Sequence, residues 1–209
     1  MKKILTTAIL CAGLVGFTAC DSFLDEEPKS SLTLDTYYKT SADIIGNVNY
    51  LYRDGAPDKM GNMTGAYRGS SLSVMNMVTG YFVNEYEGQE VDCSYARQLT
   101  RQNFTQSCCN YLTNDTWKGC YKSINVANAV IKYVDGVEMD NQAQYKAEAR
   151  FFRALNYFYL VRMFGDVPMI TEPTEDATLV EYPTRTAASE VFNTVIIPDL
   201  QFAVENLPN

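Results

Sequence analysis

The sequence predicts an all-α fold, a layered array of helices joined by long irregular loops. Two observations predict it. Apolar residues recur at the three- and four-residue spacing of an α-helix over 41–53, 117–131, 141–164 and 186–206. Within 141–164 they cover well over half of the helix circumference, so this helix must pack against neighbours on more than one side. A single helical hairpin offers no such surroundings, whereas a layered array does.

The length and composition argue against several classes of function. The chain has 209 residues, 46% of them hydrophobic, which is enough to build one domain with its own core. No stretch concentrates lysine and arginine, and the net charge is −8. Nucleic acid is therefore not expected as a partner, because phosphate binding needs clustered cations. Histidine is absent, which excludes histidine-dependent catalytic triads and H-E-x-x-H zinc sites.

The first residues have the three parts of a secretory signal. Two lysines precede an apolar run over 4–17, and the small residues Thr18 and Ala19 follow it. The run is shorter than the roughly 20 residues that a membrane-spanning helix needs. Cys20 comes next, and a cysteine at this position is similar to the lipobox of bacterial lipoproteins, although Phe17 stands where leucine is usual.

In a lipobox the cysteine thiol is linked to diacylglycerol before the signal is removed. We therefore expect residues 1–19 to be a lipoprotein signal peptide and Cys20 to be the lipidated first residue of the mature chain. The polar stretch 20–40 would then be a tether. The alternative is an ordinary secreted chain in which this cysteine is incidental.

The first helix is predicted over 41–53, where Ser41 can cap it. A shorter helix is expected over 70–79. The stretch 80–112 is irregular and rich in tyrosine, and we interpret it as a long surface loop. Loops of that length inside compact domains tend to be functional.

The remaining helices are predicted in the second half of the chain. Asp140 and Gly165 mark the start and the end of the longest one, over 141–164. The last helix runs over 186–206, and Pro198 should kink it because proline removes one backbone hydrogen bond.

The apolar pattern of these helices is similar to that of tetratricopeptide (TPR) repeats. Trp117 and Tyr121 on one helix, with Ala154 and Phe158 on the next, supply the small and large side chains that interlock in such repeats. The interval from Trp117 to Pro168 is longer than the roughly 34 residues of one repeat. We therefore expect a TPR-like array that is not a run of standard repeats.

Four stretches together carry the pattern of a known family. They are CDSFLDEEP (20–28), WKGCYKSINVANAVI (117–131), AEARFFRALNYFYLVRMFGDVPMI (147–170) and DLQFAVENLP (199–208). The third is the most specific, an acidic-x-Arg-x-x-Arg-Ala helix that closes on Phe-Gly-Asp-x-Pro. The chain thus resembles the SusD/RagB family of outer-membrane nutrient-binding lipoproteins of the Bacteroidetes. Members of that family are longer, so the resemblance implies that this is an amino-terminal portion, truncated at its carboxyl end.

The resemblance implies a fold and a role. Residues 41–209 would form the TPR-like helical part of a SusD-like fold. The protein would be anchored by its lipid (palmitate) on the cell surface, at the outer membrane. It would bind oligosaccharides or other nutrients and deliver them to a SusC-type TonB-dependent transporter, without being an enzyme. The alternative function is that of a TPR-like lipoprotein that binds a protein or peptide and no glycan.

Sugar binding needs flat apolar ring faces with polar groups at their edge, and the tyrosine-rich loop contains both. We predict ligand contacts at Tyr81, Asn84, Tyr86, Tyr95 and Arg97. A tyrosine in such a loop can equally cover the core. The acidic residues of the loop show no sign of the catalytic pair that a glycosidase needs. We interpret them as a solvated edge or a calcium site, and we expect no other cofactor or metal.

Three charged residues of the 141–164 helix are predicted to be structural. Glu148 would pair with Arg150 and Arg153, because partly buried arginine is retained only when it is paired. Asn125 and Asn128 would be hydrogen-bonding partners from the neighbouring helix, and the alternative for the arginines is an anionic ligand. The cysteines after Cys20 lack C-x-x-C spacing, so both free thiols and disulfides stay open for Cys93, Cys108, Cys109 and Cys120.

Overall fold

The computed structural model describes residues 33–55, 79–81, 98, 100–103, 116–175 and 183–208. Residues 34–209 form one compact unit. Within the described part, the all-α prediction is confirmed: extended segments pair there only at an isolated antiparallel bridge between Val167 and Thr186. The helix expected over 70–79 and most of the loop expected over 80–112 lie outside the described residues.

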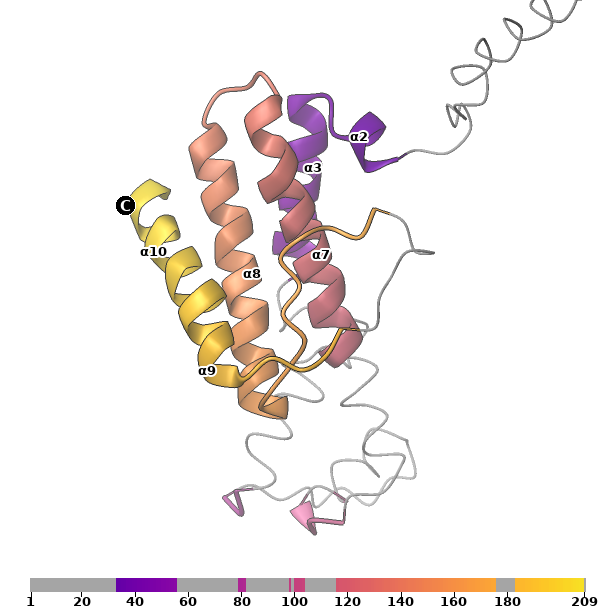
Figure 1. Cartoon of the computed structure of the whole chain (residues 1–209), viewed down its shortest axis with the longest axis vertical. Coiled ribbons are helices and arrows are strands. Elements are labelled where there is room, and N and C mark those ends of the chain that lie inside the picture. Colours follow the sequence, from indigo (N-terminus) through magenta and orange to yellow (C-terminus); the bar gives the residue numbers. More distant parts are fainter. Residues whose placement is uncertain are drawn as a thin grey trace, which may run out of the picture. The chain divides into compact units, whose positions relative to one another are not determined.

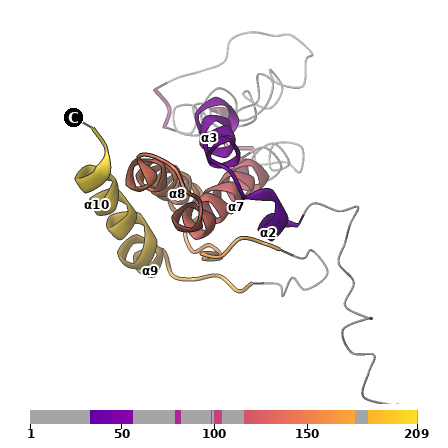
Figure 2. The same ribbon diagram turned by 90° about the horizontal axis from the view of Figure 1, so that it is seen from above.

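The longer helices stand side by side, with α8 between α7 and α10 (Figures 1 and 2). Their bounds are α3 Ser41–Tyr50, α7 Lys118–Tyr133, α8 Gln142–Phe164 and α10 Ile197–Asn206. Helix α3 packs against both α7 and α8. This is the layered arrangement expected from the apolar circumference of α8. None of the described helices is long and apolar enough to cross a membrane.

A short helix, α2 (Leu34–Tyr37), lies within the range that the sequence suggested as a tether. Tyr38 follows it and is buried, with its ring stacked on that of Tyr133 of α7 at a centroid distance of 5.2 Å. The compact unit therefore starts before α3, because Tyr38 belongs to its core.

Helix α3 is capped by Thr40 and not by Ser41. The Asp43 carboxylate accepts hydrogen bonds from the Thr40 amide (2.8 Å) and from the Thr40 hydroxyl (2.7 Å). The hydroxyl bond is the largest cause that holds the pKa of Asp43 below its usual value. After Tyr50 the helix continues as a π-helical turn, η2 (Leu51–Gly55), so the predicted range 41–53 is helical throughout but changes its type.

Helix α8 begins one residue later than expected. Its cap is Asn141 and not Asp140, and Asn141 has the left-handed backbone (φ 60°) that asparagine tolerates better than most residues. The predicted end is confirmed: Gly165 follows the helix with φ 69°, which glycine adopts without steric cost. Helix α7 ends in a short 3₁₀ turn, η5 (Val134–Gly136).

The last predicted helix, 186–206, is built from three stretches. They are α9 (Ala188–Val191), the π-helical turn η7 (Phe192–Ile196) and α10. Pro198 lies in the first turn of α10, where a missing amide hydrogen is tolerated. The chain thus accommodates Pro198 through a change of helical type just upstream of it.

The core has two clusters, and α8 contributes to both. One cluster joins α3, α7 and the first half of α8, with Ile44, Val48, Val130 and Phe152 among its members. The other joins the start of α7, the second half of α8 and the α9–η7 stretch, and it includes Ile124, Tyr157, Leu160 and Val195. On its outward side α10 exposes the apolar residues Ile197, Leu200 and Val204.

Candidate functional site

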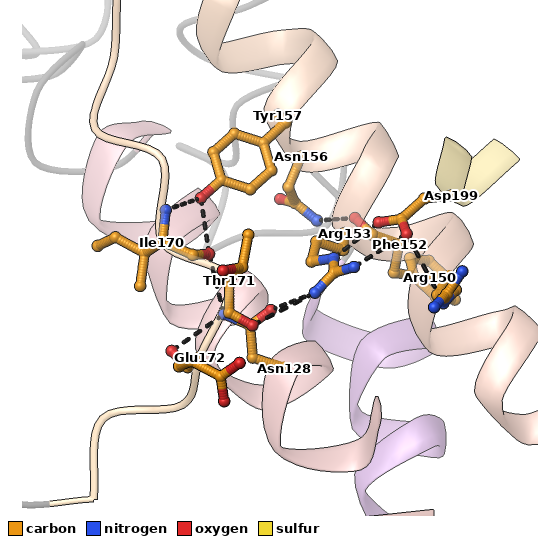
Figure 3. A network of polar contacts seen from close by, with 10 residues as sticks. All are labelled: Asn128, Arg150, Phe152, Arg153, Asn156, Tyr157, Ile170, Thr171, Glu172 and Asp199. Atoms are coloured by element: carbon orange, nitrogen blue, oxygen red, sulfur yellow. Dashed lines mark hydrogen bonds and ion pairs between the residues drawn. The ribbon is translucent and has the colours of Figure 1, made fainter. Parts of the chain in front are cut away.

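A buried ion pair joins α8 to α10 (Figure 3). Arg153 is 8% exposed and Asp199 is 2% exposed. The guanidinium donates two hydrogen bonds to the carboxylate, from Nε to Oδ2 at 2.7 Å and from Nη2 to Oδ1 at 2.9 Å. This two-point geometry is the strongest form of the arginine–carboxylate contact, and it offsets part of the cost of removing both charges from water.

The third nitrogen of Arg153 faces α7 (Figure 3). Its Nη1 donates to the Asn128 side-chain oxygen at 2.9 Å and to the Thr171 carbonyl at 3.5 Å. The Asn128 side-chain nitrogen in turn donates to the carbonyls of Ile170 (3.0 Å) and Glu172 (3.2 Å). An amide presents one acceptor and one donor end, so the guanidinium fixes which end of Asn128 meets the chain at 170–172.

Residues 168–174, which we call the strap, run in an extended course along α7 and α8 (Figure 1). The Tyr157 hydroxyl accepts from the Ile170 amide (2.6 Å) and donates to the Ile170 carbonyl (2.9 Å). The Tyr121 hydroxyl donates to the Pro168 carbonyl at 2.7 Å, and the Thr174 amide donates to the Asn125 side-chain oxygen at 2.7 Å. Each of these contacts ends on a backbone atom of the strap.

Burial keeps the two strap-binding tyrosines protonated. It raises the pKa of Tyr157 to about 12, and it also raises the pKa of Tyr121 above its usual value. Both hydroxyls therefore remain hydrogen-bond donors at any physiological pH. The side chains that hold the strap are therefore uncharged, apart from Arg153, whose charge is neutralised by Asp199.

Glu148 and Arg150 lie at the edge of this network. The carboxylate that faces both arginines is Asp199 and not Glu148, which accepts from the Gln144 side chain at 3.0 Å. Arg150 Nε is 3.7 Å from Asp199 Oδ1, and its guanidinium carbon lies 4.3 Å from the centre of the Phe202 ring, in a cation–π contact. Asn125 binds the strap and makes no described contact with either arginine.

Asp199 is the functional residue of this network that sequence reasoning missed. A signal for it exists in the sequence. Val195 and Ala203 lie four residues before and after Asp199, and both are buried, so the acid interrupts an apolar stripe of the last helix. A buried carboxylate is unfavourable unless a cation pairs with it, so its position in this stripe predicts a buried cation nearby. Arg153 is that cation.

Of the predicted ligand contacts, only Tyr81 is described. It is 88% exposed, and its backbone amide donates to the Thr79 hydroxyl at 3.3 Å. The other four, Asn84, Tyr86, Tyr95 and Arg97, lie outside the described residues. So do Cys20 and the acidic residues of the same loop.

Cys120 is buried on α7 as a free thiol. Burial raises its pKa to about 12, so it has almost no thiolate and is chemically inert under ordinary conditions. Cys93, Cys108 and Cys109 are not among the described residues. Within the described part of the chain, no three potential metal-binding side chains of histidine, cysteine, aspartate or glutamate come together.

Comparison with known proteins identifies the family. A family model described as "Starch-binding associating with outer membrane", SusD-like, matches residues 22–209. The chain belongs to the SusD-like family. Its curated relatives include SusD-like protein P2 of Formosa agariphila, which is 30% identical over 100% of this chain and 39% of the relative. A SusD-like protein of Bacteroides ovatus is 29% identical over 98% of this chain and 34% of the relative.

Solved structures show the same fold. A laminarin-binding SusD-like protein superposes with a TM-score of 0.61 at 24% identity, over 82% of this chain and 35% of that protein. A SusD-like protein of Bacteroides fragilis gives 0.62 at 16% identity, over 85% and 33%. The SusD-like chain described here thus spans between a third and two fifths of the length of the curated relatives named above.

Proposed function

We propose that this SusD-like chain is part of a surface lipoprotein that binds oligosaccharides. The observation that carries the proposal is the family match over residues 22–209, whose description names starch binding at the outer membrane. Two of the similar solved structures add support: one is a laminarin-binding protein, and another was solved with a xylogluco-oligosaccharide. The descriptions of the family and of these two structures name binding and not a reaction. The activity we propose is therefore binding without catalysis.

We propose further that the protein delivers its ligand to a SusC-type TonB-dependent transporter, with Cys20 as its lipid anchor. The family's association with the outer membrane supports a surface location. The position of Cys20, directly after a stretch with the pattern of a secretory signal, supports lipidation at that residue.

The alternative, a TPR-like groove for a peptide, has less support. Asn125, Asn128, Tyr121 and Tyr157 are the side chains of α7 and α8 that could hold an extended peptide backbone. All four already bind the chain's own strap. A peptide on this face would have to displace residues 168–174.

Binding to defined glycans tests the proposed function. Calorimetric titration of the full protein with maltooligosaccharides, laminarin oligosaccharides and xyloglucan oligosaccharides should give a measurable affinity for at least one of them. Tyr81→Ala should weaken that binding about two- to tenfold, because contact with an aromatic ring face contributes about 0.5–1.5 kcal/mol. Tyr37→Ala, which removes a half-exposed ring of α2, is the matched control and should not change the affinity. If neither these three classes nor a broad panel of other oligosaccharides binds, the proposed function is wrong.

Membrane fractionation tests the anchor. In the native host, the wild-type chain should partition with the outer membrane, because acyl chains contribute about 0.8 kcal/mol for each buried methylene. Cys20→Ala should move the protein to the soluble fraction. Retention of the Cys20→Ala protein in the membrane would contradict lipid anchoring at this residue.

A further inference from the structure

The strap is held by a chain of contacts that begins on a different helix. Asp199 of α10 holds Arg153 of α8, Arg153 holds the side-chain oxygen of Asn128 of α7, and Asn128 holds the strap carbonyls at Ile170 and Glu172 (Figure 3). Asp199 itself makes no described contact with the strap. The hydrogen bonds that connect it to the strap pass through Arg153.

The orientation of the Asn128 amide depends on this chain. With Arg153 in place, the amide oxygen meets a cation and the amide nitrogen meets two carbonyl oxygens. A flipped amide would place its oxygen against those carbonyls and its nitrogen against the guanidinium, so that every contact would be repulsive. Arg153 thus selects the one orientation of Asn128 that holds the strap.

The position of Arg153 depends in turn on α10. Two of its three guanidinium nitrogens are taken by Asp199, and the side chain is almost fully buried. Undocking of α10 would leave an unpaired cation in the core, which is strongly unfavourable, so the guanidinium would move toward water. Asn128 would then lose the partner that fixes its amide.

We propose that Asp199 is a positioning residue that makes the seating of the strap conditional on the docking of α10. The Asp199–Arg153–Asn128 chain is a conformational device with two states. When α10 is docked, the Asn128 amide is fixed and the strap is seated. When α10 is undocked, the Asn128 amide is no longer fixed and the strap is loosened at residues 170–172. This inference does not depend on the proposed glycan binding.

Amide hydrogen exchange can test the device at single residues. The amides of Ile170 and Thr174 report on the strap, because they donate to Tyr157 and to Asn125. The amides of Val130 and Leu160, inside α7 and α8, report on the helices. The double variant Arg153→Met, Asp199→Leu removes both charges of the buried pair at once. Arg150 also loses its carboxylate neighbour, but its side chain is partly exposed and keeps its contact with the Phe202 ring. In it, the strap amides should exchange at least about tenfold faster, while the two helix amides stay within about threefold of wild type.

Two control variants separate positioning from general loss of stability. Arg150→Met removes a cation that also faces Asp199, at 3.7 Å, but it has no described contact with the strap, so strap exchange should not change. Asn128→Leu should by itself loosen the strap and accelerate exchange at Ile170 and Thr174, although Tyr121, Asn125 and Tyr157 keep their contacts with it. Adding the Arg153→Met, Asp199→Leu pair to Asn128→Leu should then cause no further acceleration at Ile170 or Thr174. Equal acceleration of strap and helix amides, or unchanged strap exchange in the double variant, would overturn the proposal.

The wild-type chain provides an independent test if the double variant fails to fold. Exchange measured over a series of low denaturant concentrations gives an opening free energy for each amide. Opening of α10, read at the amide of Ala203, which is buried inside the helix one turn after Asp199, should also open the strap. The opening free energy at Ile170 and Thr174 should then be no larger than at Ala203. A larger opening free energy at the strap amides than inside α10 would mean that the strap stays in place while α10 opens. That result would refute the proposal.

Discussion

Arg153 connects three parts of the chain through one side chain. Its guanidinium meets a carboxylate of α10, an amide of α7 and a carbonyl of the strap. The sequence indicated that Arg153 would be structural, because an arginine within an apolar helix needs a partner. It did not indicate which partner. Glu148 is close in sequence, but Asp199 shares the buried face, and only the packing of α10 on α8 makes that visible.

Tyr157 is the residue at which the strap should respond to alkaline pH. Its pKa is raised to about 12 by burial, from a usual value of about 10. A raised pKa of this kind contributes stability that is fully present below pH 10 and is lost as the pH rises from about 10 to about 12. Tyr157→Phe removes the hydroxyl and leaves the Ile170 amide and carbonyl without it, which should cost about 1–3 kcal/mol near pH 7.

The measurement is urea unfolding of wild type and Tyr157→Phe between pH 7 and pH 11.5. The difference in the free energy of unfolding should shrink above pH 10 and stay constant below it. Tyr81→Phe alters an exposed hydroxyl and is the matched control, with no expected loss of stability. A difference that stays the same across the whole range would show that Tyr157 ionises as easily in the folded chain as in the unfolded one.

At the scale of helices, the element types and approximate extents could be predicted, but their exact ends could not. The ends of α8 show why. Gly165 was predictable because a left-handed residue after a helix strongly favours glycine. Asp140 and Asn141 are both good caps, and the choice of Asn141 depends on a left-handed backbone that no propensity specifies. The π-helical turn ahead of Pro198 could not be predicted either. A proline indicates that the regular helix is interrupted, but not which change of backbone geometry accommodates it.

The start of α3 should lose stability in acid. Asp43 is a carboxylate whose pKa is lowered in the folded chain. Its contribution to the free energy of unfolding is therefore fully present above its usual pKa of 3.8, and it is lost as the pH falls through the lower pKa of the folded chain. Asp43→Asn keeps the shape of the side chain but not the charge that favours a helix N-terminus. Wild type should therefore be more stable than Asp43→Asn at pH 7.

The advantage of wild type over Asp43→Asn should shrink as the pH falls below 3.8, because protonation of Asp43 removes the charge that Asn lacks. Thermal unfolding followed by circular dichroism at pH 7, 4 and 2 measures it. Thr40→Ala, which removes the hydroxyl that binds Asp43, should cost about 1 kcal/mol at pH 7. An Asp43→Asn protein as stable as wild type at pH 7 would contradict a role for this carboxylate in capping.

At the scale of the whole compact unit, α8 links the two core clusters. The sequence predicted this role from the apolar circumference of 141–164, and the packing of α8 between α7 and α10 confirms it. The candidate ligand residues have no comparable pattern in the sequence. They were predicted from composition alone, and a tyrosine-rich loop has no periodicity that says which rings face a ligand and which face the core.

The shared helix predicts cooperative unfolding of both clusters. Val48→Ala removes apolar volume from the cluster around α3, where Val48 is fully buried, and should cost about 1–3 kcal/mol. Trp117, the single tryptophan of the chain, packs against the other cluster. Its fluorescence transition in urea should shift by the same free energy as the circular dichroism transition. Asn49→Ala, at the exposed neighbouring position, is the control; an unshifted Trp117 transition in Val48→Ala would mean that the clusters unfold separately.

The strap also has a consequence for how the chain can diverge. Its hydrogen bonds from α7 and α8 end on peptide groups, and the side chains of Thr171, Glu172 and Thr174 are exposed. Substitutions at these three positions can therefore accumulate with little effect on folding, provided that the backbone keeps its course. The edge formed by the strap is thus open to change in charge and shape without loss of the contacts that hold it to the helices beneath.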